Sequence, residues 1–261
     1  MTTSIHSDTP VLFECRELTK QFTIGRSSLR ILAGVNCSIP SGAITLISGR
    51  TGQGKSTLLG LLGGLDSPTS GQILFRGAPL PVSDIEKMAQ WRRGRVGVVF
   101  QHSNLLPSWT ALQNVEAALM DGTLSARDRK QHAFEWLERF NLADRADHLP
   151  MQLSAGQQQL TALARAMASD PEVILADEPT GDVDPQTAEE ILERLTGFVR
   201  AGKGSLIVAS HGTFLPENAD CVLELKNGIL GSPESCPNPK TKQQNTTQHN
   251  SQAGFAKKAL P

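Results

Sequence analysis

Apolar and polar positions along the chain follow two periods, and their alternation predicts an α/β fold. Continuous apolar runs indicate strands buried on both faces of a parallel sheet, at residues 44–47, 95–100, 172–176 and 205–210. Apolar residues at helical spacing predict helices between these runs, at residues 57–62, 83–92, 153–169 and 185–200. In the helix at 83–92, Ile85, Met88 and Ala89 would share one face.

The chain before residue 44 has a different pattern, in which short strand-like segments are separated by turn residues. Strands are expected at residues 11–13, 18–22 and 31–39, with a hairpin turn where small residues cluster at 25–28. This pattern predicts an antiparallel β-subdomain placed before the parallel core. Phe22 lies at the edge of that layer, where it would either pack in the core or stack on an aromatic base.

A helical insertion is predicted at about residues 102–160, between two buried strands of the core. Thr110 and Ser125 precede segments of helical periodicity, and both residue types cap helix N-termini. One apolar stripe in the insertion is interpreted as core packing, and it consists of Ala133, Trp136, Leu137 and Phe140.

The segment after the first buried run has the form of a phosphate-binding loop. It fits the pattern G-x-x-x-x-G-K-[ST] between a strand and a helix, a context that a chance match in a glycine-rich turn would lack. Glycines let backbone N–H groups curl around a triphosphate, and the helix N-terminus adds partial positive charge. Lys55 would reach the β- and γ-phosphates, and the Ser56 hydroxyl would ligate Mg²⁺. The residues expected to contact the nucleotide here are Gly49, Arg50, Thr51, Gly52, Gln53, Gly54, Lys55, Ser56 and Thr57.

Polar residues end three further buried strands, at the edge where parallel sheets present groups to ligands. Gln101 follows one strand and could place its amide oxygen on Mg²⁺ or on an attacking water. Asp177 and Glu178 follow the next strand, where Asp177 would hold Mg²⁺ and Glu178 would face the water as general base. His211 follows the last strand and would donate a hydrogen bond to phosphate or to water. Each of these residues alone would also suit a surface turn or a structural role.

A second helix N-terminus has an anion-binding character, because Ser154 can cap it while further N–H groups stay free. A capped helix alone is common, but this chain already has one phosphate-type site. The second site would be useful if it faced the γ-phosphate held by another copy of the chain. Its contacting residues would be Ser154, Ala155, Gly156 and Gln157.

Composition narrows the classes of function. With 39% hydrophobic and 20% charged residues the chain is globular, and its formal net charge of −1 gives no pull toward nucleic acid. Apolar runs stay short of the roughly 18 residues that a membrane-spanning helix needs, so any membrane role is expected to come through a partner. Residues 1–10 are interpreted as a loose leader without a signal-peptide pattern, and residues 231–261 as a disordered tail rich in polar residues.

Taken together, these segments resemble the ATP-binding-cassette ATPases over about residues 11–230. The resemblance rests on an ordered set of motifs, which are the phosphate loop, Gln101, LSAGQ at 153–157, VILADE at 173–178, Asp184 and His211. It implies a P-loop NTPase core with an antiparallel β-subdomain and an inserted helical subdomain. Phe22 then stands where the family places its adenine-stacking aromatic residue.

The resemblance also implies ATP hydrolysis in a head-to-tail homodimer. Each ATP would lie between the Lys55 loop of one subunit and the segment 154–157 of the other, with Asp184 also at the nucleotide. Glu178 would act as the general base, and Lys55 and His211 would stabilise charge. The residues implied to hold Mg²⁺ are Ser56, Gln101 and Asp177.

Longer stretches are similar to the lipoprotein-releasing and macrolide-export branch of the family, namely GGLDSPTSG at 63–71, FQHSNLLPSWTALQNV at 100–115 and LADEPTGDVD at 175–184. Such ATPases lie on the cytoplasmic face of the inner membrane under separate permeases, which export or release lipophilic substrates. Residues 102–109 would then contact the permease. A non-transport cassette, such as a cell-division regulator, is the alternative that stays open.

Four positions depart from the family pattern without removing a catalytic group. Ala155 replaces the second glycine of LSGGQ, and its methyl group would either slow engagement of the γ-phosphate or be accommodated. Leu160 stands where arginine is common, and Thr161 replaces a usual aliphatic residue. Asp182 stands where this branch more often has asparagine.

Overall fold

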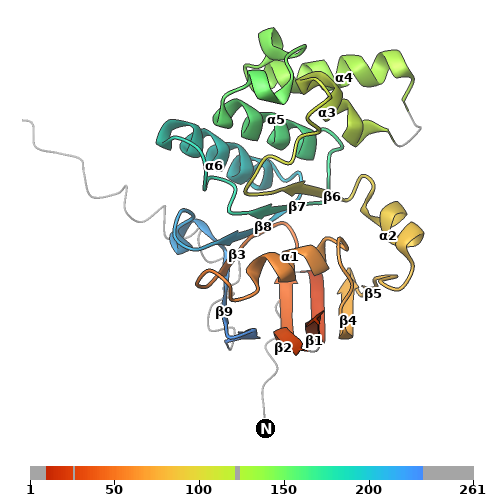
Figure 1. Ribbon diagram of the computed structural model, residues 1–261, viewed down its shortest axis with the longest axis vertical. Helices are drawn as coiled ribbons and strands as arrows, with labels where there is room; N and C mark the ends of the chain where they lie inside the picture. Colours follow the sequence, from red (N-terminus) through yellow and green to blue (C-terminus); the bar gives the residue numbers. More distant parts are fainter. Residues whose placement is uncertain (1–9, 26, 121–123, 232–261) are drawn as a thin grey trace, which may run out of the picture.

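Two β-sheets and the helices packed on them make up residues 10–25, 27–120 and 124–231, the part of the chain that this computed structural model describes. A four-stranded sheet lies at one end of the molecule, a six-stranded sheet crosses its middle, and helices form the other end (Figure 1). The predicted α/β class, with its antiparallel subdomain and helical insertion, is confirmed. The predicted leader and tail lie outside the described residues, except for Pro10 and Gly231.

The four-stranded sheet is antiparallel, with the strand order β2-β1-β4-β5. Its strands are β1 (Val11–Ile24), β2 (Ser27–Pro40), β4 (Ser70–Phe75) and β5 (Ala78–Pro79). The two N-terminal strands predicted from sequence are one continuous strand, β1. Its pairing register shifts between Cys15 and Leu18, and Glu17 there has a φ of 48°. This bulge displaces the apolar alternation without ending the strand, which explains why the sequence pattern reads as two segments.

The six-stranded sheet has the order β10-β9-β3-β8-β7-β6, and its neighbours are parallel except for the β9–β10 hairpin. Its strands are β3 (Ile44–Ser48), β6 (Val96–Val99), β7 (Val173–Asp177), β8 (Ser205–Ser210), β9 (Cys221–Lys226) and β10 (Ile229–Leu230). Because β3, β6, β7 and β8 run in one direction, their carboxyl ends meet at one edge of the sheet. The polar residues that follow these strands are thereby brought close together.

Helices cover this sheet on both faces, and the alternation along β7 shows how. Val173 and Leu175 pack in one apolar cluster with the leucines of α1 (Lys55–Leu62). Ile174 and Ala176 pack in a second cluster with residues of α5 (Ala155–Met167) and α6 (Pro185–Arg200). The helix after the phosphate loop and the helix after LSAGQ therefore lie on opposite faces of the sheet, as Figure 1 shows.

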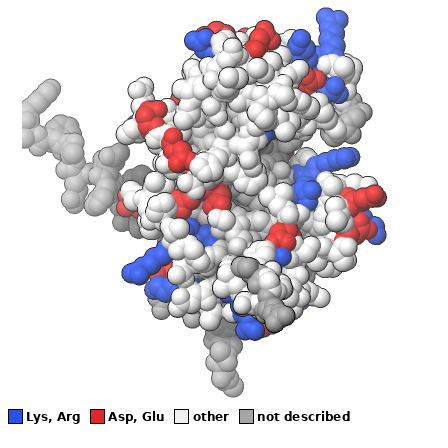
Figure 2. Space-filling view, in the orientation of Figure 1, with Lys and Arg blue, Asp and Glu red and all other residues white. Residues whose placement is uncertain are grey.

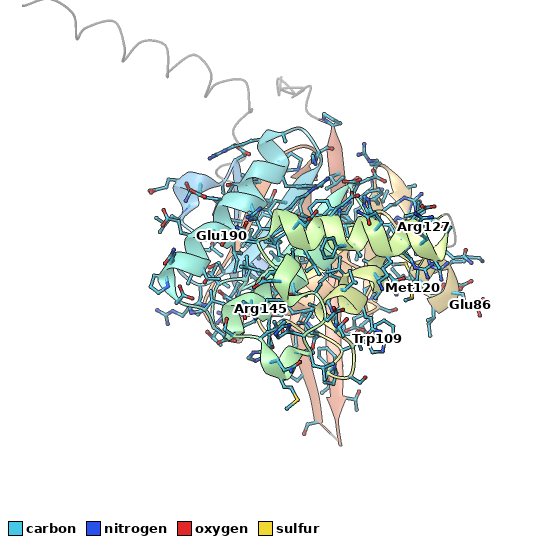
Figure 3. The ribbon with its side chains drawn as sticks, turned by 90° about the horizontal axis from the view of Figure 1, so that it is seen from above. Glu86, Trp109, Met120, Arg127, Arg145 and Glu190 are labelled. Carbon is cyan, nitrogen blue, oxygen red and sulfur yellow. The ribbon has the colours of Figure 1, made fainter. Side chains whose placement is uncertain are left out.

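The helical insertion forms the top of the molecule, where α4 (Ala126–Arg139) lies across the view from above (Figure 3). Both predicted helix caps are present, because Thr110 accepts a hydrogen bond from the Gln113 N–H and Ser125 accepts one from the Asp128 N–H. The remaining elements are α2 (Ile85–Arg92), α3 (Ala111–Glu116) and four short 3₁₀ turns, η1 (Ala117–Leu119), η2 (Ala143–Arg145), η3 (Pro150–Gln152) and η4 (Pro216–Asn218).

The helix predicted at 83–92 exists as α2, and the residues of its predicted shared face differ in burial. Ile85 is 86% exposed, whereas Met88 is buried. Ile85 is the first residue of the helix, directly after the Asp84 cap, and this turn extends beyond the edge of the core. Periodicity locates a helix face but does not say where along the helix the core ends.

The surface carries both signs of charge. Lysine and arginine side chains alternate with aspartate and glutamate side chains over the face shown in Figure 2, so no single-sign field covers that face. Within the described ranges, no helix has the length and the apolar character needed to cross a bilayer.

Candidate functional site

The loop between β3 and α1 is held in a glycine-dependent conformation. Gly49, Gly52 and Gly54 have φ values of 151°, 80° and 100°, a region that side chains rarely adopt. Gly54 is also crowded, because a Cβ there would lie 3.0 Å from the Ile31 side chain and 3.1 Å from that of Leu32. The loop therefore seats on β2 of the antiparallel sheet while it curls toward the N-terminus of α1.

Lys55 lies at the centre of this loop and is almost completely buried. Its Nζ donates hydrogen bonds to the carbonyl oxygens of Gly49 at 2.9 Å and Arg50 at 3.3 Å. The loop thus encloses its own lysine, and two backbone carbonyl oxygens of the same loop hold the ammonium.

Three charged or titratable side chains meet at the loop, one from the start of α1 and two from the ends of β7 and β8. The Glu178 Oε1 atom lies 2.7 Å from the His211 Nδ1 atom and 3.6 Å from the Lys55 Nζ atom. Glu178 is buried, and its φ of 44° is a left-handed value that non-glycine residues seldom adopt. Such backbone strain is characteristic of functional positions, since the surrounding structure must enforce it. The structure therefore brings together Lys55, Glu178 and His211.

Asp177, which precedes Glu178, has the surroundings of a metal ligand. Burial raises the pKa of the Asp177 carboxyl, with the Glu178 charge as a smaller cause, while a hydrogen bond from the Ser56 hydroxyl and the Lys55 charge oppose the rise. Its Oδ1 atom is buried and has no hydrogen-bond partner among the described residues. A carboxylate oxygen without a donor, next to a hydroxyl, fits a divalent cation with a preference for oxygen ligands such as Mg²⁺.

Gln101, the other predicted magnesium ligand, lies exposed at the end of β6 and packs over the loop after Glu178. A Cβ at Gly181 would be 3.3 Å from the Gln101 Nε2 atom. The next residue, His102, places its Nδ1 atom 2.8 Å from a carboxylate oxygen of Asp182. These contacts link the segment after β6 to the segment after β7. A role of Gln101 at the metal stays a prediction.

The helix N-terminus at 154–157 has the capped geometry that the sequence predicts, and anion binding there stays a prediction. The Ser154 hydroxyl accepts a hydrogen bond from the Gln157 N–H, and the Gln157 side chain accepts one from the Ser154 N–H. Gly156 is buried close to α6, where a Cβ would lie 2.9 Å from the Thr187 Oγ1 atom. Ala155 is exposed, so its methyl group meets open surface within this chain. Because α5 and α1 lie on opposite faces of the sheet, the structure does not bring this segment to the phosphate loop of the same chain.

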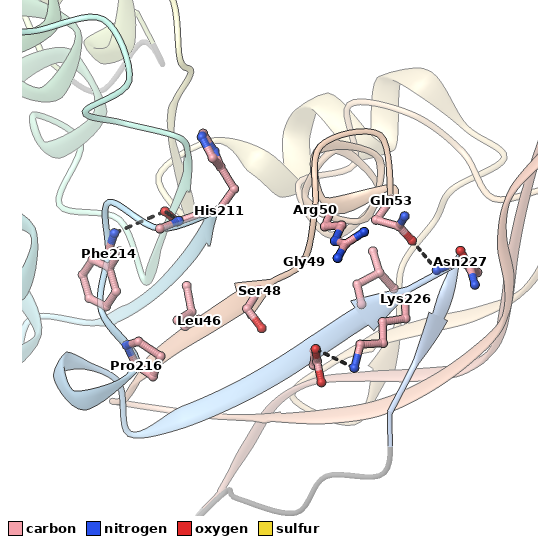
Figure 4. A pocket seen from close by; sticks show the side chains of 14 residues that line it. Leu46, Ser48, Gly49, Arg50, Gln53, His211, Phe214, Pro216, Lys226 and Asn227 are labelled. Atoms are coloured by element: carbon pink, nitrogen blue, oxygen red, sulfur yellow. Dashed lines mark hydrogen bonds and ion pairs between the residues drawn. The ribbon is translucent and has the colours of Figure 1, made fainter.

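A cavity of about 700 Å³ opens beside the phosphate loop (Figure 4). The side chains of Arg50, Gln53, His211 and Asn227 line it. The Asn227 N–H donates a hydrogen bond to the Gln53 side chain, so the turn between β9 and β10 braces the loop from one side. The Asn-Gly turn at 227–228, which joins β9 and β10, thus also supports the phosphate loop.

Phe22 lies on β1 near the hairpin end, and the residue is 38% exposed. It pairs with Leu29 of β2, two residues before the Ile31 side chain that contacts the phosphate loop. The antiparallel sheet therefore carries an exposed aromatic ring close to where the phosphates are predicted to bind.

Asp184, predicted to contact the nucleotide, has a clear structural role in the chain. It caps α6, because its carboxylate accepts hydrogen bonds from the Thr187 N–H at 3.0 Å and the Thr187 hydroxyl at 2.7 Å. These bonds lower the pKa of the Asp184 carboxyl. A nucleotide contact stays a prediction for this residue.

Two buried side-chain amides, of Asn114 and Gln159, support the segments around the site, and the sequence pattern did not predict this role. Asn114 donates to the carbonyl oxygens of Leu106, Trp109 and Thr110, and so holds the loop after Gln101 in shape. Gln159 lies on α5 and donates to the Phe100 oxygen at 2.8 Å and the Pro179 oxygen at 3.0 Å. It thereby fixes the backbone next to Gln101 and Glu178. The available signal was an amide at an otherwise apolar helix position.

Similarity to known proteins extends over most of the described chain. The family model for "ABC transporter" matches residues 32–181, which include the phosphate loop, Gln101, the segment 154–157 and Glu178. His211 and Phe22 lie outside the matched residues.

Two similar proteins align over nearly their whole lengths. An "Uncharacterized ABC transporter ATP-binding protein" of Thermotoga maritima is 42% identical over 219 residues, which cover 84% of this chain and 93% of that protein. The "Lipoprotein-releasing system ATP-binding protein LolD" of Idiomarina loihiensis is 39% identical over 222 residues, which cover 85% of this chain and 97% of that protein.

Solved structures show the same architecture. The dimeric post-hydrolysis structure of the ATP-binding cassette MJ0796, bound to ADP and Pi, has a TM-score of 0.80 and 34% identity, covering 87% of this chain and 99% of that chain. CbiO1 from Clostridium perfringens, part of the ABC transporter complex cbiONQ, has a TM-score of 0.73 and 25% identity, covering 94% of this chain and 96% of that chain.

Proposed function

Because this chain belongs to the ABC transporter ATP-binding proteins, which hydrolyse ATP, we propose that it drives a separate membrane permease that exports or releases a lipophilic substrate. The lipoprotein-releasing relative is similar over 97% of its length, which supports this branch of the family. The chain would then work on the cytoplasmic face of the inner membrane and reach the bilayer through the permease.

The observation that carries the catalytic part is the meeting of Lys55, Glu178 and His211 beside the phosphate loop. In the proposed reaction a water oxygen attacks the γ-phosphorus while the bond to the oxygen bridging the β- and γ-phosphates breaks. Glu178 accepts the proton of that water. Lys55 and His211 stabilise the negative charge that develops on the phosphoryl oxygens. The products are ADP and phosphate.

Mg²⁺ fits the pocket beside the loop, where Ser56 and Asp177 would hold it and Gln101 would approach from β6. When bound, the cation neutralises charge on the β- and γ-phosphates. A triphosphate would also compete for the Lys55 donors now used by the Gly49 and Arg50 carbonyls. The exposed ring of Phe22 would stack on the adenine.

A head-to-tail dimer would complete the site. The segment 154–157 is exposed at its start and lies across the sheet from Lys55 of its own chain, so a second copy would have to supply it. The similar cassette MJ0796 forms a dimer in its ADP- and Pi-bound structure. We infer the same pairing here.

The loop at 102–109 is the proposed contact for the permease. Arg165 donates to the Ser103 oxygen at 2.9 Å and the Asn104 oxygen at 2.8 Å, which adds to the hydrogen bonds from Asn114. Leu106 stays exposed in this rigid loop, and Trp109 lies near the rim of the molecule in the view from above (Figure 3). A loop held in one conformation by these hydrogen bonds can present a fixed surface to a partner with little loss of conformational freedom.

The test is to isolate the permease that co-purifies with the chain, place both in lipid vesicles and measure phosphate release. We expect the permease to accelerate hydrolysis, and we expect Glu178→Gln to abolish release with or without it. If hydrolysis proceeds equally fast without any membrane partner, the non-transport alternative gains and the transport assignment fails.

A further inference from the structure

We propose that Lys20 is a positioning residue for the nucleobase, because it holds the Phe22 ring and ties it to the segment that follows α1. This inference rests on the proposed stacking of adenine on Phe22. It assigns a role in ATP affinity to a residue that touches neither the phosphates nor the reacting atoms.

Lys20 is anchored more firmly than a surface lysine. It is 9% exposed, and its Nζ lies 2.6 Å from the Asp66 Oδ1 atom and 2.8 Å from the Ser67 oxygen. The same Nζ lies 4.8 Å from the centroid of the Phe22 ring. An ammonium at this distance from an aromatic face is attracted to it, and the two anchors fix where the ammonium sits. One face of the ring is therefore held against a fixed charge.

A second set of contacts fixes the backbone of the same strand. The Gln21 N–H donates to the Thr69 hydroxyl at 3.0 Å, and the Thr69 N–H donates to the Thr19 oxygen at 2.8 Å. Residues 66–69 are thus hydrogen-bonded to β1 on both sides of Lys20. This segment follows α1 by a short turn, so the aromatic ring and the phosphate loop are joined through one helix.

This arrangement reduces the conformational freedom that the Phe22 side chain loses when a nucleotide binds. A phenylalanine at a strand edge would otherwise sample several side-chain rotamers, and a ligand that stacks on it would have to select one. With one face against Lys20, the other face can accept the base without that loss of freedom. The expected signature is a change in affinity for ATP with little change in the rate of the chemical step.

The primary experiment compares Lys20→Met with Lys20→Arg and with the surface control Lys87→Met. Methionine keeps the length of the apolar stem and removes the charge, and arginine keeps a cation that can bind Asp66 and the ring. We expect Lys20→Met to raise KM for ATP about three- to tenfold at unchanged kcat, and arginine to restore most of the affinity. Inhibition by inorganic tripolyphosphate, which has no base, should stay as in the parent protein.

Two further variants separate this inference from the proposed function. Asp66→Asn weakens the anchor from the more exposed side, and it should reproduce the Lys20→Met effect even if that variant folds poorly. Phe22→Ala removes the platform, and combining it with Lys20→Met should add no further loss.

Different negative results would contradict the role of Lys20 and the stacking on Phe22. An unchanged KM in Lys20→Met and Asp66→Asn, or an equal loss of tripolyphosphate affinity, would overturn the role of Lys20 alone. An unchanged KM in Phe22→Ala would refute the stacking itself, and the role of Lys20 with it.

Discussion

The phosphate loop and the segment 154–157 are both helix N-termini suited to anions, yet the chain supports them in opposite ways. The phosphate loop is enclosed, with Lys55 buried, β2 beneath it and the turn at 227–228 against its side. Segment 154–157 uses its own Ser154 and Gln157 to cap itself and leaves Ser154 and Ala155 exposed. The first is enclosed by its own chain, and the second presents an exposed surface that would face a second copy in the proposed dimer.

The largest expected effect concerns the phosphate loop together with the neighbouring Glu178 and His211, which we call the enclosed half of the site. Glu178→Gln keeps the shape of the side chain but removes the base, so kcat should fall by about 10²- to 10⁴-fold while ATP still binds. Because the nucleotide is not consumed, the variant should accumulate as a dimer. Phosphate release and light scattering with ATP measure the two effects, and unchanged phosphate release would refute the assignment of the base.

The second prediction tests whether the two halves come from different chains. Lys55→Ala removes the lysine of the loop and should weaken ATP binding, and Ser154→Arg obstructs the exposed segment, so each variant alone should hydrolyse little ATP. Mixed in equal amounts, they form heterodimers with one intact composite site, and about a quarter of the activity should return. ATPase rates of the mixture measure this recovery.

The matched control for this mixture combines Lys55→Ala with Glu178→Gln. Both substitutions lie in the enclosed half, so every site in the heterodimer carries one of them and no activity should return. Recovery in both mixtures, or in neither, would contradict a site shared between subunits.

The third prediction uses the pKa of Asp177, which burial raises above its usual value of 3.8. Without metal, the folded state binds a proton at this carboxyl more strongly than the unfolded state does. The residue's contribution to stability is therefore present below pH 3.8 and lost as pH rises through the raised pKa. Mg²⁺ competes with that proton. Stabilisation by Mg²⁺ and ATP should therefore weaken as pH falls, and thermal unfolding from pH 8 to pH 5 measures it. Asp177→Asn should flatten this dependence, and an unchanged slope would contradict the metal role.

Sequence reasoning predicted the enclosed half well, because its logic is local or topological. A phosphate-loop motif predicts its own strand and helix, and parallel strands bring residues such as Glu178 and His211 to one edge. The pairing of Lys20 with Asp66 could not be predicted, since it joins residues 46 positions apart whose approach depends on the tertiary packing of β1 against the turn after α1. The exposure of Ile85 could not be predicted for a similar reason, because the limit of the core depends on the packing of the whole domain.

The smallest expected effect concerns the support of the loop at 102–109. Asn114 is fully buried, and truncating it removes the acceptor of the Leu106 N–H, now at 2.7 Å, and one donor to each of three carbonyl oxygens. The Leu106 and Thr110 oxygens each keep a backbone hydrogen bond. Asn114→Ala should lower the free energy of unfolding by about 1–3 kcal/mol. Denaturant unfolding measures that loss, and the exposed neighbour Gln113→Ala, which removes only part of a capping box, should cost less.

Hydrolysis by the Asn114→Ala chain alone should stay near the parent rate, because Lys55, Glu178 and His211 are held by other contacts. A loss of basal hydrolysis as large as that of Glu178→Gln would mean that the helical insertion and the enclosed half are not separable, and the contrast between them would fail.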